Sequence, residues 1–171
     1  RTAFFLIGTF MALWVILYGL IQANAPRILR AKTRPTDELI KVARDWAWRL
    51  AAVPTILTGV AIIAGEPQLW LTISLVTGLL IFGIVFAVNS SLHSYLILSF
   101  TKAERVTMDV GFYYMANAAG RLAGTLLSGL TYQICGLPLM LGVAAFMVAL
   151  SAIMVGLLKP CLLYTSDAAD E

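Results

Sequence analysis

Five apolar runs, each long enough to cross a membrane, constrain this chain more than any other feature of its sequence. They cover residues 2–22, 47–64, 69–100, 107–133 and 139–158. An α-helix rises about 1.5 Å per residue, so about 20 apolar residues span the roughly 30 Å hydrocarbon core of a bilayer. Only 12% of the residues are charged, against about 25% in soluble domains. The sequence therefore predicts an all-α membrane protein with five transmembrane helices.

Turn and kink signals lie between and within these runs. Turns containing glycine and proline are expected at 65–67 and 135–138, and Pro54 is expected to kink the second helix. The run at 69–100 exceeds one perpendicular crossing, but no proline, charged residue or turn dipeptide divides it. We therefore expect one helix there, with tilt absorbing the extra length.

Residues 24–45 form the longest polar stretch, and we expect a basic loop there. Pro26 and Pro35 are expected to interrupt any single helix across it, because proline lacks a backbone N–H and clashes with the preceding turn. Residues 37–46, DELIKVARDW, can still form a short amphipathic helix at the membrane surface.

Basic residues gather on one side of the predicted spans. With the five spans alternating in direction, all of the loop cations fall on the side that holds residues 24–45 and 101–106, and Arg1 alone falls on the other. By the positive-inside rule that side and the native C-terminus are cytoplasmic, in a multi-pass protein of the cell inner (plasma) membrane. Membrane lipid is thus the expected partner, and nucleic acid is not. The residues that set this topology are Arg27, Arg30, Lys32, Arg34, Lys102 and Arg105.

The two ends of the chain suggest a fragment. It has 171 residues, begins almost directly in an apolar run and lacks an initiator Met. We expect residues 1–160 to be the C-terminal transmembrane bundle of a longer protein, whose N-terminal half is then a further partner. Residues 161–171, CLLYTSDAADE, resemble a translated sequencing adapter and are expected to be a non-native tail; a genuine short polar tail is the alternative.

Polar side chains deep inside the fourth run are the main candidates for function. Tyr114, Asn117 and Arg121 are spaced i, i+3 and i+7 and share one helix face, which Tyr113 borders. A guanidinium there suits a carboxylate or phosphate-like group, because its planar fork donates two hydrogen bonds at once. Alternatively, Arg121 binds backbone carbonyls or a carboxylate elsewhere in the protein, and the tyrosines are ordinary interior aromatics.

A second polar face lies on the third run. Asn89 and His93 are four residues apart, so they share a face, and Ser90 and Ser94 form the neighbouring row. We expect the Asn89/His93 face to line a cavity. His93, the single histidine, can carry a proton, donate a neutral hydrogen bond to a substrate, or simply be satisfied within its helix.

Small residues recur every four positions along the fourth run, at Ala116, Gly120, Gly124 and Ser128. Such a row lets another helix approach closely, so we expect it to pack a helix; homodimerisation is the weaker alternative.

Signals for metal binding, cofactors and catalysis are not found in the sequence. His93 has no second ligand at suitable spacing, and the two cysteines, Cys135 and Cys161, form no metal or disulfide pattern. There is no phosphate-binding glycine loop, no carboxylate pair inside a span and no nucleophile beside a base. We therefore predict neither an enzyme nor a metal or cofactor site.

Three segments together carry a family resemblance that extends over nearly all of residues 1–160. They are FFLIGTFMALWVILYGLIQANAPR, VNSSLHSYLILSFT and VTMDVGFYYMANAAGRLAGTLLSGL. They resemble spans eight to twelve of a major facilitator superfamily transporter, and within it the ArsJ family of organoarsenical efflux permeases. YGLIQANAPRILR resembles the superfamily's glycine-to-arginine motif but lacks its usual acidic residue.

This resemblance implies a function and a partner. It implies a secondary active efflux transporter, an antiporter driven by a proton or ion gradient, that exports 1-arseno-3-phosphoglycerate and so confers arsenate resistance. A glyceraldehyde-3-phosphate dehydrogenase that uses arsenate in place of phosphate would supply this small anionic substrate. Export of another small anion, a sugar or a drug is the first alternative, and a non-transporting membrane receptor or scaffold is the second.

Overall fold

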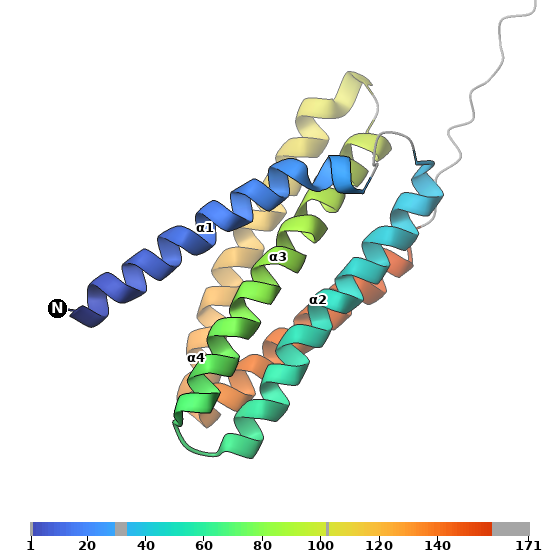
Figure 1. Ribbon diagram of the computed structural model, residues 1–171. Coiled ribbons are helices and arrows are strands. Elements are labelled where there is room, and N and C mark those ends of the chain that lie inside the picture. The colour runs from blue at the N-terminus through green and yellow to red at the C-terminus, as the bar shows by residue number, and fades with distance from the viewer. Residues whose placement is uncertain (1, 30–33, 102, 159–171) are drawn as a thin grey trace, which may run out of the picture.

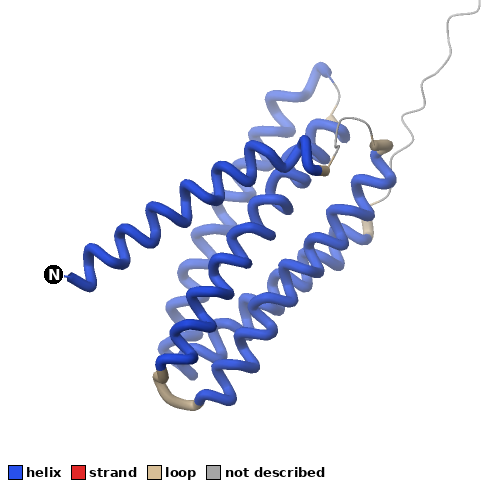
Figure 2. The backbone as a smooth tube through the Cα atoms, in the orientation of Figure 1, coloured by secondary structure: helices blue, strands red, loops and turns tan. Residues whose placement is uncertain are grey.

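A computed structural model of the chain describes residues 2–29, 34–101 and 103–158. Every regular element in this part of the chain is a helix (Figures 1 and 2). The all-α prediction is therefore confirmed for this part of the chain, and all four α-helices are long and apolar enough to cross a membrane. The elements are α1 (Thr2–Ile28), α2 (Thr36–Ala64), α3 (Leu69–Phe100), the short 3-10 helix η1 (Ala103–Arg105) and α4 (Val106–Gly156).

Some of the sequence-based predictions fall outside the described residues. These are the topology residues Arg30, Lys32 and Lys102 and the tail at 161–171.

The loop predicted at 24–45 is wrong at both ends, because helix occupies most of it. α1 runs on through Pro26 to Ile28, and α2 begins at Thr36, directly after Pro35. A proline next to a helix start does no harm, since the first N–H groups of a helix have no partner within it. Asp37 and Glu38 in the first turn favour the start as well, because they face the positive end of the helix dipole. Residues 37–46 are thus the first turns of α2, not a separate surface helix.

The prediction of one helix at 69–100 is confirmed, since α3 has the same bounds. A tight turn precedes it, seen as the tan connection between α2 and α3 in Figure 2. Gly65 in this turn has a φ of 64°. That left-handed conformation favours glycine, because a Cβ would crowd the following carbonyl.

α4 has 51 residues, about 76 Å of helix at the usual rise, which is more than twice the thickness of a bilayer core. Its backbone leaves helical geometry at Cys135 and Gly136, inside the turn predicted at 135–138. Beyond this break the chain runs back alongside α2 (Figure 1). Two contacts fix the direction, since Gly142 lies against Thr58 and Gly156 against Arg44. The part of α4 after the break is therefore antiparallel to α2.

Two clusters of buried apolar side chains hold the bundle together. One joins the C-terminal end of α1 to the first turns of α2, the second half of α3 and Val155 of α4. The other lies around the α2–α3 turn, where the segment just after the α4 break packs. The N-terminal half of α1 is left uncovered by the described residues, and Phe4 is 77% exposed. The buried members of the first cluster are Ala25, Leu29, Leu39, Ile40, Ala43, Val88, Leu92, Leu96 and Val155, and those of the second cluster are Ala61, Ala64 and Leu71.

Four helix termini lie at one end of the bundle, and three of them carry charged residues. The end of α1, the start of α2, the end of α3 and the start of α4 all lie at the upper end of the view in Figure 1. Of the topology residues, Arg27, Arg34 and Arg105 lie in these segments. The opposite end holds the α2–α3 turn, with Glu66, and the α4 break.

Candidate functional site

A pocket of about 540 Å³ lies between α1, α3 and the first half of α4, and we name it the three-helix pocket. It combines a cation, amide and hydroxyl groups with several aromatic rings. Four of the six site residues predicted from the sequence line it, all of them on α4. The complete lining is Trp14, Val15, Tyr18, Gln22, Phe86, Ser90, Ser94, Tyr113, Tyr114, Asn117 and Arg121.

The α4 wall follows from helical spacing. Tyr114, Asn117 and Arg121 face the pocket together, with Tyr113 beside them and its ring centroid 5.5 Å from that of Tyr114. Arg121 is exposed, and within the described residues its guanidinium forms no hydrogen bond and no ion pair. Its backbone carbonyl accepts a hydrogen bond from the Thr125 hydroxyl at 2.8 Å. The cation is therefore open to a partner from outside these helices.

The α3 wall uses the row next to the one favoured by the sequence. Ser90 and Ser94 line the three-helix pocket, whereas Asn89 and His93 do not. Asn89 is buried at 7% exposure, and its Oδ1 has no hydrogen-bond partner among the described residues. His93 Nδ1 lies 2.8 Å from the Asn89 backbone carbonyl, to which it donates, since a carbonyl only accepts.

His93 lines a different pocket, of about 330 Å³, near the turn between α3 and α4. Asp109 lies in the same lining, together with Phe100, Phe112 and Leu158. The structure therefore separates the predicted site into two places. The α4 residues share the three-helix pocket, and His93 belongs to the end of the hairpin.

The α1 wall was missed by the sequence analysis. Trp14, Tyr18 and Gln22 are four residues apart and so share a face of α1. The Trp14 and Tyr18 rings stack with centroids 5.8 Å apart, and the Tyr18 ring lies 5.7 Å from Phe86 of α3. The signal was available in the spacing of two aromatic residues and a glutamine in an apolar span, but that pattern equally suits a structural helix contact.

The small-residue row on α4 lies open. No heavy atom comes within 4 Å of a Cβ built at Gly120 or Gly124, and Ala116 and Ser128 are exposed. No described helix therefore packs against this row, and its role in packing stays a prediction about a helix beyond the described residues.

The three-helix pocket is suited to an organic anion. Arg121 supplies a charged bidentate donor, and Asn117, Gln22 and the serine hydroxyls add neutral hydrogen bonds. The aromatic rings of α1 and α3 offer apolar surface to the uncharged part of a ligand. Within the described residues, no group of three His, Cys, Asp or Glu side chains could hold a metal ion.

Comparisons of the chain with protein-family models, curated proteins and solved structures found no match. The class is defined by the fold and the pocket alone. In its described residues the protein is helical, with four helices long and apolar enough to cross a membrane and a polar pocket between three of them.

Proposed function

We propose that the chain is the C-terminal part of a secondary active transporter of the major facilitator type, which moves a small organic anion by alternating access. The observation that carries the proposal is Arg121, a cation in an apolar helix, facing a pocket of about 540 Å³ without an ion-pair partner in the described chain. An arginine at membrane depth costs about 2.5–3.5 kcal/mol on insertion scales. A substrate anion would offset that cost and give the residue its role.

The proposed topology has five spans, with α4 counted as two because of the break at Cys135 and Gly136. Its support is the antiparallel return of the chain along α2 and the length of α4. The end of the bundle with Arg27, Arg34 and Arg105 is cytoplasmic in this proposal, by the positive-inside rule. The missing N-terminal half would complete the pocket opposite Arg121.

The resemblance favours 1-arseno-3-phosphoglycerate as the substrate, exported in exchange for a proton or another ion. That molecule has an anionic group at each end. Arg121 suits one end, and the hydroxyl and amide groups of Ser90, Ser94 and Asn117 suit the oxygens between. The other end requires a second cation, which we expect in the N-terminal half.

The direct test expresses the complete gene with its dehydrogenase in arsenic-sensitive cells. We expect arsenate resistance and arsenic efflux to rise, and Arg121→Ala and Arg121→Lys to abolish both while the protein remains in the membrane. Arg49→Ala is the matched control, because Arg49 lies over the Trp46 ring, 5.0 Å from its centroid, and not in the pocket. No gain of resistance with the wild-type gene would refute the arsenical as substrate.

Uptake into everted vesicles separates the alternatives. Equal transport of the arsenical and of phosphorylated sugars would identify a more general anion exporter. Wild-type transport by Arg121→Ala would remove this pocket from the mechanism. A protein that transports none of these anions, yet folds and inserts, would favour the receptor or scaffold interpretation.

A further inference from the structure

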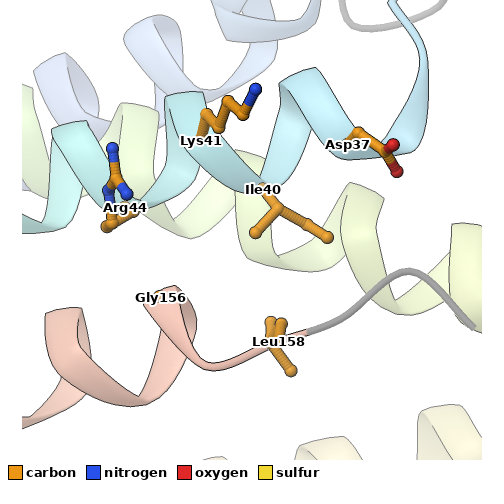
Figure 3. Close-up of a pocket in the computed structure, with 6 residues that line it drawn as sticks. All are labelled: Asp37, Ile40, Lys41, Arg44, Gly156 and Leu158. Carbon is orange, nitrogen blue, oxygen red and sulfur yellow. The ribbon is translucent and has the colours of Figure 1, made fainter.

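A second pocket, of about 260 Å³, lies at the charged end of the bundle, between the first turns of α2 and the last residues of α4 (Figure 3). We name it the end pocket. It shares no residue with the three-helix pocket. Its lining residues are Asp37, Ile40, Lys41, Arg44, Gly156 and Leu158.

Charges of both signs follow one another along its α2 side. Lys41 comes four residues after Asp37, and Arg44 three residues later, so helical spacing places the three on one side of α2. Neighbours at this spacing have Cβ atoms about 5–6 Å apart. Within the described residues Asp37 and Lys41 are not paired with each other. A carboxylate and an ammonium thus stand about one helical turn apart, each available to a ligand.

Arg44 is held at the edge of the pocket by α4. A Cβ built at Gly156 would lie 3.2 Å from Arg44 Cδ, so the absence of a side chain at 156 makes room for the stem of the arginine. The negative end of the α4 dipole favours a cation at this place. Arg44 Nη2 also pairs with Asp45 Oδ1 at 3.2 Å, and both side chains are about half exposed. That pair is solvent-screened and easily exchanged for another anion.

The rest of the lining is apolar. Figure 3 shows Ile40 extending from α2 toward Leu158, and Ile40 is buried at 6% exposure. Along α2 the charged turns are followed by Trp46, Trp48 and Arg49, and then by the apolar span. Tryptophan is enriched where a membrane-crossing helix meets the headgroup region, and Trp48 is 47% exposed. In a bilayer the end pocket would therefore lie at headgroup level.

We propose that the end pocket binds the headgroup of a zwitterionic phospholipid with a primary ammonium, as in phosphatidylethanolamine. The phosphate lies against Lys41 and Arg44, the ammonium donates to Asp37, and the glycerol and first acyl carbons cover Leu158, which is 43% exposed. An anionic lipid lacks a cation for Asp37 and is repelled by it. A choline headgroup cannot donate a hydrogen bond, because its nitrogen is fully methylated. The proposal requires a membrane-embedded bundle but not transport.

Native mass spectrometry of the full chain, released from nanodiscs with equal phosphatidylethanolamine, phosphatidylcholine and phosphatidylglycerol of matched acyl chains, tests the proposal. We expect phosphatidylethanolamine to be retained about two- to fivefold over each of the others, the range of one exposed ion pair. Asp37→Asn removes the preference over phosphatidylcholine. Lys41→Gln lowers the retention of phosphatidylethanolamine and of phosphatidylcholine, because the phosphate of each lipid contacts Lys41.

Two matched controls lie outside the pocket. Glu38→Gln removes an acid from the same turn of α2, and Arg49→Gln removes a cation further along the helix; both should retain the wild-type preference. Soluble phosphoethanolamine, added at millimolar concentration, should not displace the lipid, since it lacks the acyl chains; displacement would overturn the lipid as occupant. Equal retention of the three lipids, a preference for phosphatidylglycerol, or an unchanged preference in Asp37→Asn would also overturn the proposal.

Discussion

The indole of Trp14 on α1 lies directly over Gly83 on α3. Its Nε1–H passes the glycine and donates a hydrogen bond to the Leu79 carbonyl at 3.0 Å. A Cβ built at residue 83 would lie 2.6 Å from Nε1 and 2.9 Å from Cε2 of the indole. No side chain fits there, so Gly83 is what allows α1 to dock on α3 beside the three-helix pocket.

Gly83→Ala should therefore loosen α1. The indole is rigid and hydrogen-bonded, so the added methyl must push α1 away, and overpacking of this kind costs about 1–3 kcal/mol. Gly78→Ala should cost less, although a Cβ there lies 2.7 Å from Leu57 Cδ1, because the end of a leucine side chain can rotate. The measurement is the free energy of unfolding in mixed micelles titrated with dodecyl sulfate.

Gly19→Ala on α1 is the control for helix propensity, since no heavy atom comes within 4 Å of a Cβ at that position. It should be neutral or stabilise by up to about 1 kcal/mol. If Gly83→Ala and Gly19→Ala have the same free energy of unfolding, the Trp14–Gly83 contact does not hold α1 in place.

What the sequence predicted well depends on spacing within one helix. Asn117 and Arg121 share a face because any helix places them so, and the bounds of α3 follow from an unbroken apolar run. Ser90 and Asn89 differ by about 100° around α3, and only the packing of α1 and α4 decides which of these rows meets the pocket.

Two further differences separate the sequence-based predictions from the structure: the α1 wall of the pocket and the length of the loop at 24–45. Trp14 and Tyr18 line the pocket because Gly83 admits α1, a relationship between residues about 70 positions apart that no local pattern carries. The loop predicted at 24–45 is shorter in the structure, because its polar composition does not distinguish an irregular loop from helix. A helix that continues beyond the membrane has the same composition.

Gly136→Ala should destabilise the return of α4 along α2. Gly136 has φ 68° and ψ −157°, a conformation that is essentially restricted to glycine, and a side chain there costs about 1–3 kcal/mol. Gly129→Ala is the matched control, because it lies inside the same helix with open space at its Cβ. Unfolding midpoints in the same micelles compare the two. Equal midpoints would mean that the turn at 135–138 accepts another conformation at no cost.

Asn89→Leu should leave stability unchanged or raise it by about 1 kcal/mol. The Asn89 side chain is buried, and Oδ1 has no hydrogen-bond partner in the described chain, so its desolvation is uncompensated. The hydrogen bond from His93 goes to the backbone of residue 89 and survives the change. Unfolding in micelles measures the effect, with Val88→Leu as a control for added volume. A loss of more than about 2 kcal/mol would show that the amide has a structural partner.

Gly124→Leu tests where the partner of the small-residue row lies. In the chain described here a Cβ at 124 would meet nothing within 4 Å outside its own helix, and residue 124 is exposed, so the unfolding free energy of Gly124→Leu should change by less than about 0.5 kcal/mol. In the complete transporter that we propose, a helix of the other half packs on this row, and the same substitution should lower the yield of folded protein. Gly129→Leu is the matched control, being equally open but one residue off the row. Fluorescence-detected size exclusion of both proteins measures the yield. If Gly124→Leu and Gly129→Leu fold equally well in the complete protein, the row faces lipid, and the other half must close the three-helix pocket from a different side.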